Sequence, residues 1–405
     1  MISLDEALER LLQGVQPVAE TDTLPTAQTL GRVLTRGVVA GIPVPSADNS
    51  AMDGYAVRVA DAGQERAVLQ RVPAGRWPEP LPENGVARIF TGASLPAGAE
   101  AVVMQEQCEA RTDAEGRSWV RLPADIAAGQ HVRRAGEDVR AGHEILPAGT
   151  RLNAAALGLA ASVGLAALPL RRRVRVALFS TGDELVMPGE PLPPGAIYNS
   201  NRFTLRGLAE AAGCQVSDFG IVPDRLDAMR DALRRAAEQH DLIVTSGGVS
   251  VGEEDHLKPA AEAEGRIDHW QIAMKPGKPL AFGSIRRPDG SSALLVGLPG
   301  NPVSSFVTWL VAVSTVLRAL QSMSTGLPQS LALRADFDWT RPDKRREFLR
   351  VRLNEAGGVE LFSNQSSGVL TSAVWADGLV DNPGGQAIQR GGTVRFLPLA
   401  SLVAR

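Results

Sequence analysis

The strongest constraint on the fold is an alternation of two periodicities between Val174 and Gln321. Short segments rich in apolar and β-branched residues alternate there with longer segments of helical periodicity. Strands are expected at residues 174–180, 216–222, 241–246 and 294–297, and helices at residues 201–213, 225–239 and 302–321. This order is typical of a parallel sheet whose two faces are covered by helices. The sequence therefore predicts a doubly wound α/β domain over residues 171–323.

The segments on either side of this domain differ from it, so the chain is expected to be a multidomain protein of α/β and β parts. Residues 41–142 contain short apolar stretches separated by Gly and Pro, which is typical of a small β domain. That domain interrupts residues 1–40 and 143–170, which are expected to form an elongated helical domain. Residues 324–405 alternate in polarity and contain Gly-rich turns, and they predict a C-terminal β domain.

Two helices are expected in the elongated domain. The first follows Ser3, which suits an N-cap, with Glu6 three residues later as in a capping box. The second covers residues 154–170 and is expected to pack beside the first. This Ala- and Gly-rich segment is uncharged, but it is shorter than the roughly 20 residues that span a membrane. With an acidic N-terminus that does not resemble a signal peptide, the sequence predicts a cytoplasmic protein without a membrane segment.

Charge and cysteine content exclude several other classes of protein. The chain carries 42 basic and 45 acidic residues, a formal net charge of -3, so no basic surface for nucleic acid is expected. Cys108 and Cys214 are far apart and form no CxxC pair, which excludes a disulfide framework and a cysteine zinc site. An anionic ligand must therefore be held by local groups.

Four unusual loops follow the predicted strands of the α/β domain, with the sequences TGDEL, PDR, GGVSVGEED and LPGNP. The candidate site residues among their polar, Gly and Pro residues are Thr181, Asp183, Glu184, Asp224, Gly247, Gly248, Ser250, Asp255, Pro299, Asn301 and Pro302. Each loop alone could be a tight turn or a helix cap. Because ligands of parallel sheets bind outside the carboxyl ends of the strands, four such loops at one edge predict a binding site.

The residue types in these loops suit anions and a divalent cation. Gly247 and Gly248 let backbone N–H groups approach an anion closely, and Asn301 followed by Pro302 suits the N-terminus of a helix. Lys275 and Lys278 lie in the proline-stiffened segment MKPGKPL and add two ammonium groups. The carboxylates Asp183, Glu184, Asp224 and Asp255 are oxygen ligands of the kind that Mg²⁺ takes when it bridges a phosphate.

Common catalytic signatures are absent or incomplete. The sequence contains no GxGxxG after a strand and no GxxxxGK[ST], and its five histidines form no spaced metal set. Residues 248–252 match GxSxG, with Ser250 as a possible nucleophile and His256 or His269 as possible bases. A hydrolase remains an alternative, although no helix directly follows the serine and no oxyanion loop is present.

The same loops belong to a series of motifs that resembles the MoeA/gephyrin E-domain family of molybdopterin molybdenumtransferases. The resembling segments, in the family's order, are DNSAMDGYAV (48–57), FTGASLPAGAEAVVMQE (90–106), RRAGEDV (133–139), FSTGDEL (179–185), SGGVSVGEEDHLK (246–258), KPGKPLAFG (275–283), GLPGNPVS (297–304), RREFLRVRL (345–353) and NQSSGVLTSAVWADGL (364–379). They cover nearly the full chain. The resemblance implies a helical N-terminal region, an inserted β domain, a central α/β domain similar to molybdopterin adenylyltransferases such as MogA, and a C-terminal β barrel.

The resemblance also implies a reaction. In this family, adenylylated molybdopterin and molybdate react with Mg²⁺, AMP is released, and the pterin dithiolene takes up molybdenum. The inserted β domain completes the site of a partner subunit, so a homodimer is implied, with transient contacts to other proteins of cofactor biosynthesis. Two alternatives stay open: a molybdopterin adenylyltransferase, and a scaffold or binding module of the gephyrin kind.

Site residues follow from the resemblance and from the loops together. The expected catalytic residues are Asp53, Asp138, Glu184, Asp224 and Asp255, and the expected metal ligands are Asp183, Glu184, Asp224 and Asp255. The expected residues for pterin nucleotide or oxyanion are Thr91, Thr181, Gly247, Gly248, Ser250, Lys275, Lys278, Pro299, Asn301, Pro302, Arg346, Arg350 and Ser367. One position departs from the family: Asn199 stands where Asp is frequent, and we expect Asn199, Ser200 or Asn201 to cap the next helix.

Overall fold

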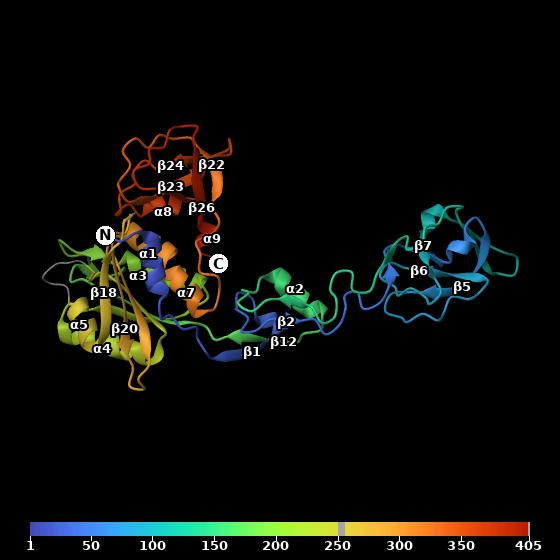
Figure 1. Cartoon of the computed structure of the whole chain (residues 1–405), viewed down its shortest axis with the longest axis horizontal. Coiled ribbons are helices and arrows are strands. Elements are labelled where there is room, and N and C mark those ends of the chain that lie inside the picture. The colour runs from blue at the N-terminus through green and yellow to red at the C-terminus, as the bar shows by residue number, and fades with distance from the viewer. Residues whose placement is uncertain (250–255, 404–405) are drawn as a thin grey trace.

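The computed structural model describes residues 1–249 and 256–403. Figure 1 shows an elongated molecule in which a thin arm joins a large lobe, containing both chain termini, to a small distant lobe. The large lobe consists of the α/β domain and the C-terminal domain. The small lobe is the inserted β domain.

The α/β domain contains a six-stranded sheet in the order β16-β13-β17-β21-β20-β18. Its strands are β13 (Arg175–Thr181), β16 (Gln215–Val222), β17 (Leu242–Ser246), β18 (Gly265–Gln271), β20 (Pro279–Arg286) and β21 (Ser292–Leu298). The first four in the sheet order pair in parallel, and β20 and β18 are antiparallel. The predicted doubly wound sheet is thereby confirmed.

Helices cover both faces of this sheet, and each face buries its own apolar cluster. One cluster includes residues of α1 (Leu4–Leu12), α3 (Ser200–Ala211) and the helix that runs through α6 (Pro302–Thr308), a π-helical turn (Trp309–Val313) and α7 (Ser314–Leu320). The other includes residues of α4 (Leu226–Gln239) and α5 (Leu257–Glu264). The helix Pro302–Leu320 is long and apolar enough to cross a membrane, but 83% of its most apolar window is buried inside the protein. It is therefore a core helix.

The C-terminal domain is a closed barrel, as the resemblance implied. Its strands are β22 (Leu331–Ala335), β23 (Arg346–Leu353), β24 (Gly358–Leu361), β25 (Gly378–Asn382) and β26 (Thr393–Pro398), with α8 (Thr371–Trp375) and α9 (Leu399–Val403) beside them. Pairing of β23 with β25 closes the ring β23-β24-β22-β26-β25. The short strand β19 (Met274–Lys275), which precedes β20 of the α/β domain, pairs in parallel with β23. This pairing joins the two domains.

The arm consists of short antiparallel pairs and one helix. Strand β1 (Thr21–Pro25) pairs with β12 (Ala167–Arg171), β2 (Val38–Val39) pairs with β11 (Glu144–Leu146), and α2 (Ala154–Ser162) packs on them. Two expectations are wrong here. The helix predicted over residues 154–170 ends at Ser162, because Gly164 turns the chain with φ +82° and Leu168 and Leu170 alternate into the core as a strand.

The second wrong expectation concerns the first helix, which does not pack beside α2. Helix α1 begins after its predicted cap, Ser3, whose hydroxyl accepts a hydrogen bond from Glu6 N at 3.1 Å. Its buried side chains, Leu4, Ala7 and Leu11, lie in the core cluster of the α/β domain against α7. Burying this apolar stripe against a large core stabilises the helix more than the slender arm could.

The inserted domain is a six-stranded sheet in the order β7-β4-β6-β5-β9-β8. Its strands are β4 (Gly54–Val57), β5 (Glu65–Val72), β6 (Gly85–Ile89), β7 (Ala101–Met104), β8 (Glu109–Thr112) and β9 (Ser118–Arg121). Two further short pairs are β3 (Asn49–Ser50) with β10 (Val132–Arg133), next to this sheet, and β14 (Leu185–Val186) with β15 (Ile197–Tyr198) in the α/β domain. Single 3₁₀ turns lie at Thr26–Gln28, Val59–Asp61 and Gln105–Gln107.

Candidate anion-binding cleft

A cleft of about 720 Å³ lies between the α/β domain and the C-terminal barrel. It is lined by loops at the carboxyl ends of β17, β18 and β21, by the segment from Lys275 to Pro279, and by two loops of the barrel. Predicted site residues that line it are Gly247, Gly248, Lys275, Lys278, Pro299, Asn301 and Ser367. These seven residues come from four separate segments of sequence, and the fold brings them to one place.

Gly247 and Gly248 form the wall of the cleft that follows β17. Both have positive φ angles, +92° and +67°, which residues with a side chain rarely adopt. A Cβ atom on Gly247 would come within 2.5 Å of the Thr181 carbonyl oxygen at the end of β13. The predicted residue Thr181 therefore lies directly behind this loop, and the close contact requires glycine.

The loop between β21 and α6 forms a second wall and is held from two sides. Asn301 is the N-cap and Pro302 the first residue of α6, as the sequence predicts. The Asn201 side chain donates to the Gly300 carbonyl at 2.7 Å, and Val303 N donates to the Ser367 carbonyl of the barrel at 2.9 Å. Pro302 has no N–H and the N–H of Val303 is already bonded, so this wall suits an anion mainly through the partial positive charge at the helix N-terminus.

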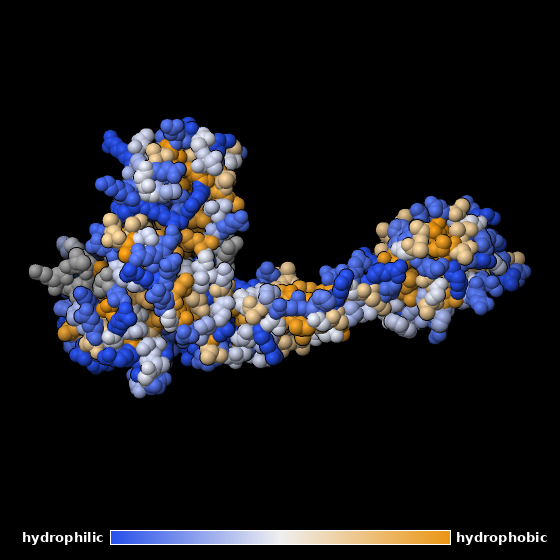
Figure 2. Space-filling model, viewed as in Figure 1, coloured by the Kyte–Doolittle hydropathy of each residue, from blue (hydrophilic) through white to orange (hydrophobic). Residues whose placement is uncertain are grey.

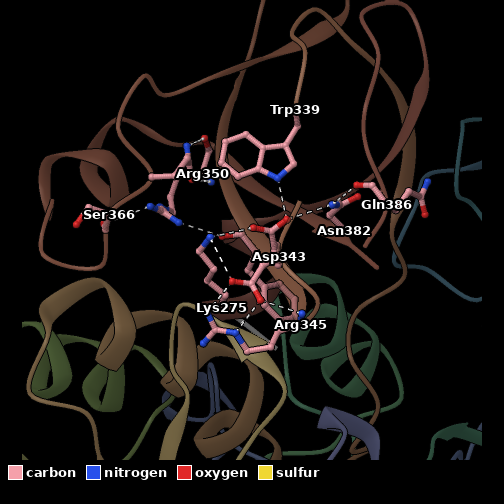
Figure 3. Close-up of polar contacts among 11 residues, drawn as sticks. Lys275, Trp339, Asp343, Arg345, Arg350, Ser366, Asn382 and Gln386 are labelled. Atoms are coloured by element: carbon pink, nitrogen blue, oxygen red, sulfur yellow. Dashed lines mark hydrogen bonds and ion pairs between the residues drawn. The ribbon is translucent and has the colours of Figure 1, made fainter. Parts of the chain in front are cut away.

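The two predicted lysines have different surroundings, as Figure 3 shows for Lys275. The Lys275 ammonium lies 3.3 Å from a Glu347 carboxylate oxygen and 3.6 Å from one of Asp343. Asp343 also binds Arg345, at 2.9 and 2.8 Å, and this hydrogen-bonded guanidinium holds the pKa of Asp343 well below its usual range. Lys278 is exposed and makes no ion pair with any residue that the structure describes. The positive charge of Lys278 is thus the less compensated of the two.

Two predicted arginines of the barrel lie outside the lining of the cleft. Arg346 binds Asp381 through two hydrogen bonds of 2.6 and 2.7 Å and also contacts Asp5 of α1. Arg350 is 1% exposed, and this burial lowers its pKa to about 10. It donates to the Ser366 carbonyl at 3.4 Å, so it supports the barrel loop that lines the cleft. Their predicted contacts with an oxyanion remain predictions.

The predicted acidic cluster divides among several environments. Asp183 and Glu184 are exposed after β13, whereas Asp224, after the adjacent strand β16, has a buried Oδ1 atom without a hydrogen-bond partner. The hydroxyl of Thr181 is likewise buried without a partner. Within residues 1–249 and 256–403 no three His, Cys, Asp or Glu side chains gather as a metal site. Ser250 and Asp255 lie outside the described residues, as does the core of the GxSxG match.

Three further predicted residues lie in the region of the distant lobe, far from the cleft of the same chain (Figure 1). Asp53 accepts hydrogen bonds from the backbone N and the hydroxyl of Thr91 at 2.7 and 2.8 Å, and these bonds lower the pKa of Asp53. Asp138 is exposed beside Val44, where the arm meets the inserted domain. One chain therefore does not bring these residues to its own cleft.

Sequence patterns missed several residues of the cleft: Trp270, Gln271, Ser304, Arg345, Gln365 and Ser366 also line it. Arg345 directly precedes the predicted Arg346, and its acidic neighbour Asp343 was the only local signal.

The departure at Asn199 from the family pattern is explained by helix capping. Its side chain accepts a hydrogen bond from Arg202 N at 3.2 Å and caps α3, so the neutral residue performs the expected capping.

The arrangement defines a multidomain α/β protein with a cleft suited to anions at the edge of a doubly wound sheet. Family models match three stretches of the chain. Residues 2–164 match the MoeA N-terminal region (domain I and II), residues 177–319 a probable molybdopterin binding domain, and residues 332–399 the MoeA C-terminal region (domain IV).

Known proteins resemble the chain over almost its full length. It is 39% identical to a molybdopterin molybdenumtransferase of Haemophilus influenzae over 90% of this chain and 89% of that protein. It is 37% identical to molybdopterin molybdenumtransferase 2 of Mycobacterium tuberculosis over 93% and 94%. The crystal structure of a molybdopterin biosynthesis MoeA protein from Pyrococcus horikoshii superposes with a TM-score of 0.82 at 25% identity, covering 98% of this chain and 99% of that one. The chain belongs to the MoeA family of molybdopterin molybdenumtransferases.

The glycine loop allows a direct test of the cleft wall. Gly247→Ala is expected to lower the free energy of unfolding by about 1–3 kcal/mol, because it combines a positive φ with a contact against a carbonyl oxygen. Gly300→Ala is the matched control, since a Cβ there meets no atom within 4 Å, and it should change stability by less than about 0.5 kcal/mol. Thermal and denaturant unfolding measure both. Equal stability of the two variants would show that the wall tolerates a side chain.

Proposed function

We propose that this protein inserts molybdenum into molybdopterin. Its substrates are adenylylated molybdopterin and molybdate, and AMP is released. The observation that carries the proposal is the cleft itself, where the glycine loop after β17, the N-terminus of α6 and the Lys278 ammonium line one cavity between two domains. The relatives named as molybdopterin molybdenumtransferases align with this chain over most of their length, which supports the same activity here.

The main task of the site is to hold two anions together. Two unit charges 4 Å apart repel each other by about 4 kcal/mol near a protein surface, so molybdate and a phosphate need fixed cations between them. Lys278 and the N-terminus of α6 provide this compensation, and the close approach of Gly247 to the Thr181 carbonyl leaves no room for a side chain behind the cleft wall. Holding the reactants in one orientation, and stabilising charge on the phosphate as AMP leaves, are the two catalytic effects that we assign to the cleft.

We also propose that Mg²⁺ binds beside the cleft. The loops after β13 and β16 leave adjacent strands, since Thr181 pairs in register with Val222, and they carry Asp183, Glu184 and Asp224. The Oδ1 atom of Asp224 is buried and has no hydrogen-bond partner. A bound cation would supply the partner that this oxygen lacks. Because protein-bound Mg²⁺ usually takes only one or two carboxylates and shares substrate phosphates, a complete protein cage is not needed. When bound, the cation would neutralise charge on those phosphates.

The working form is proposed to be a homodimer in which the inserted domain of one chain completes the cleft of the other. Asp53, Thr91 and Asp138 are too distant to serve their own cleft, which supports this arrangement. Figure 2 shows apolar surface along the arm, and Leu30, Val39 and Ile42 of this region are 62%, 56% and 45% exposed. A continuous exposed apolar surface is typical of an interface with another protein chain. We further propose a cytoplasmic location, which cell fractionation would test.

The activity is tested by incubating the protein with adenylylated molybdopterin, Mg²⁺ and molybdate. Molybdate-dependent AMP release is expected, and Lys278→Met should lower kcat/KM roughly 10- to 100-fold because it removes the free cation. Lys258→Met is the control, since Lys258 is exposed on α5 and pairs with Glu262. Release of pyrophosphate from ATP would instead identify an adenylyltransferase. Pterin binding without any turnover would favour a binding module.

Metal removal tests the cation. Enzyme treated with EDTA is expected to lose AMP release, and added Mg²⁺ should restore it. Asp224→Asn should raise the Mg²⁺ concentration needed for half-maximal rate roughly tenfold, because an amide oxygen replaces a carboxylate. Full activity in metal-free buffer would refute the proposed cation.

Mixed dimers test the sharing of sites. Asp53→Asn and Lys278→Met chains carrying different affinity tags can be co-expressed, and the heterodimer purified through both tags. Each homodimer should be weakly active, whereas the heterodimer has one unaltered site and should recover about half of the wild-type rate. A heterodimer no more active than its parents would contradict a shared site.

A further inference from the structure

Glu347 is a fully buried carboxylate at the junction of the two domains. Its residue exposure is 0%, and its side chain has donors on several sides. Trp339 Nε1 donates to Oε2 at 2.7 Å, Asn382 Nδ2 lies 3.5 Å from the same oxygen, and the Lys275 ammonium lies 3.3 Å from Oε1. A buried charge of this kind is costly unless it is paired and hydrogen-bonded. Among these partners, only Lys275 also lines the cleft.

The backbone places Glu347 and Lys275 opposite each other. Strand β19 pairs in parallel with β23, and Lys275 is the register partner of Glu347. The adjacent hydrogen bond from Arg346 N to the Ala273 carbonyl, at 2.9 Å, fixes the same junction. Glu347 belongs to the barrel and Lys275 to the α/β domain, so their ion pair spans the two domains.

The ion pair leaves Lys275 able to bind a further group. Its side chain is 39% exposed, whereas that of Glu347 is 1% exposed. An ammonium has three donors, and two carboxylates, Glu347 and Asp343, lie within 4 Å on the barrel side (Figure 3). A flexible lysine fixed in this way loses less rotamer entropy when an anion arrives, so its contribution to binding is preorganised.

We propose that Glu347 is a positioning residue: it holds the Lys275 ammonium at the cleft for an oxyanion, and Trp339 in turn holds Glu347. The proposal rests on the proposed function, because the oxyanion is either molybdate or a phosphate of the pterin nucleotide. An amide in place of the carboxylate still accepts from Trp339, but it loses the charge that attracts Lys275 and turns its own donors toward the ammonium. Lys275 then keeps only the more distant Asp343, at 3.6 Å, as an ionic partner on the barrel side, and its ammonium is held less firmly.

The test is a double-mutant cycle on the full-length protein with Glu347→Gln, Lys275→Met and both changes together. Glu347→Gln is expected to raise the KM of one of the two anionic substrates roughly tenfold, with a smaller change in kcat. In the Lys275→Met background, Glu347→Gln should add less than about a twofold change, because the residue on which it acts is gone. Measuring KM separately for molybdate and for adenylylated molybdopterin identifies which oxyanion Lys275 contacts.

Two further variants keep the test independent of folding. Trp339→Phe removes the donor to Glu347 without changing any charge, and it should raise the same KM by roughly threefold. Glu360→Gln is the control, since the Glu360 side chain is 39% exposed on the same barrel and pairs with Arg352. Additive effects of Glu347→Gln and Lys275→Met, or an unchanged KM for both substrates, would overturn the positioning role. Absence of turnover in the wild-type protein would instead count against the proposed function.

Discussion

The pairing of β19 with β23 is the interaction on which the cleft depends. Met274 and Lys275 of the α/β domain form a short strand that pairs with the barrel strand β23. Their partners in β23, Arg346 and Glu347, lie 72 residues later in the sequence. The junction is reinforced beneath the backbone, because Phe348 of the barrel lies in the same apolar cluster as α6 and α7. Without this docking the glycine loop and the helix N-terminus would remain, but the barrel loops at Arg345 and Ser367 would not face them.

This junction also distributes charge in the cleft. Lys275 is compensated by Glu347 and Asp343, and Arg345 is compensated by Asp343, so most of the cleft's positive charge is already paired with buried or half-buried carboxylates. Of the three cationic side chains that line the cleft, only Lys278 forms no ion pair with a described residue. The anion binding that we propose would therefore rely on a few directed donors and not on a large excess of positive charge, which agrees with a formal net charge of -3 for the whole chain.

Sequence patterns predicted the parts of the site that local signals specify. Short runs rich in apolar and β-branched residues identified the strands, and Gly247, Pro299 and Asn301 followed because they lie in the loops just after strand ends. The partnership of Lys275 with Glu347 could not be predicted, since it depends on how the barrel docks 72 residues away in sequence. Burial of Arg350 has the same origin. The wrong prediction of a helix over residues 154–170 has a different cause. An Ala- and Gly-rich run has no clear hydrophobic period, and its end forms a strand because it pairs with β1.

The arm that separates the two lobes in Figure 1 has a kinetic consequence. If each complete site takes residues from two chains, as we propose, then dilution below the dimer dissociation constant dismantles sites while every domain stays folded. In that regime the rate of product formation depends on the square of the protein concentration. The reach of the arm would thereby link the output of the enzyme to its own abundance, without any additional regulatory ligand.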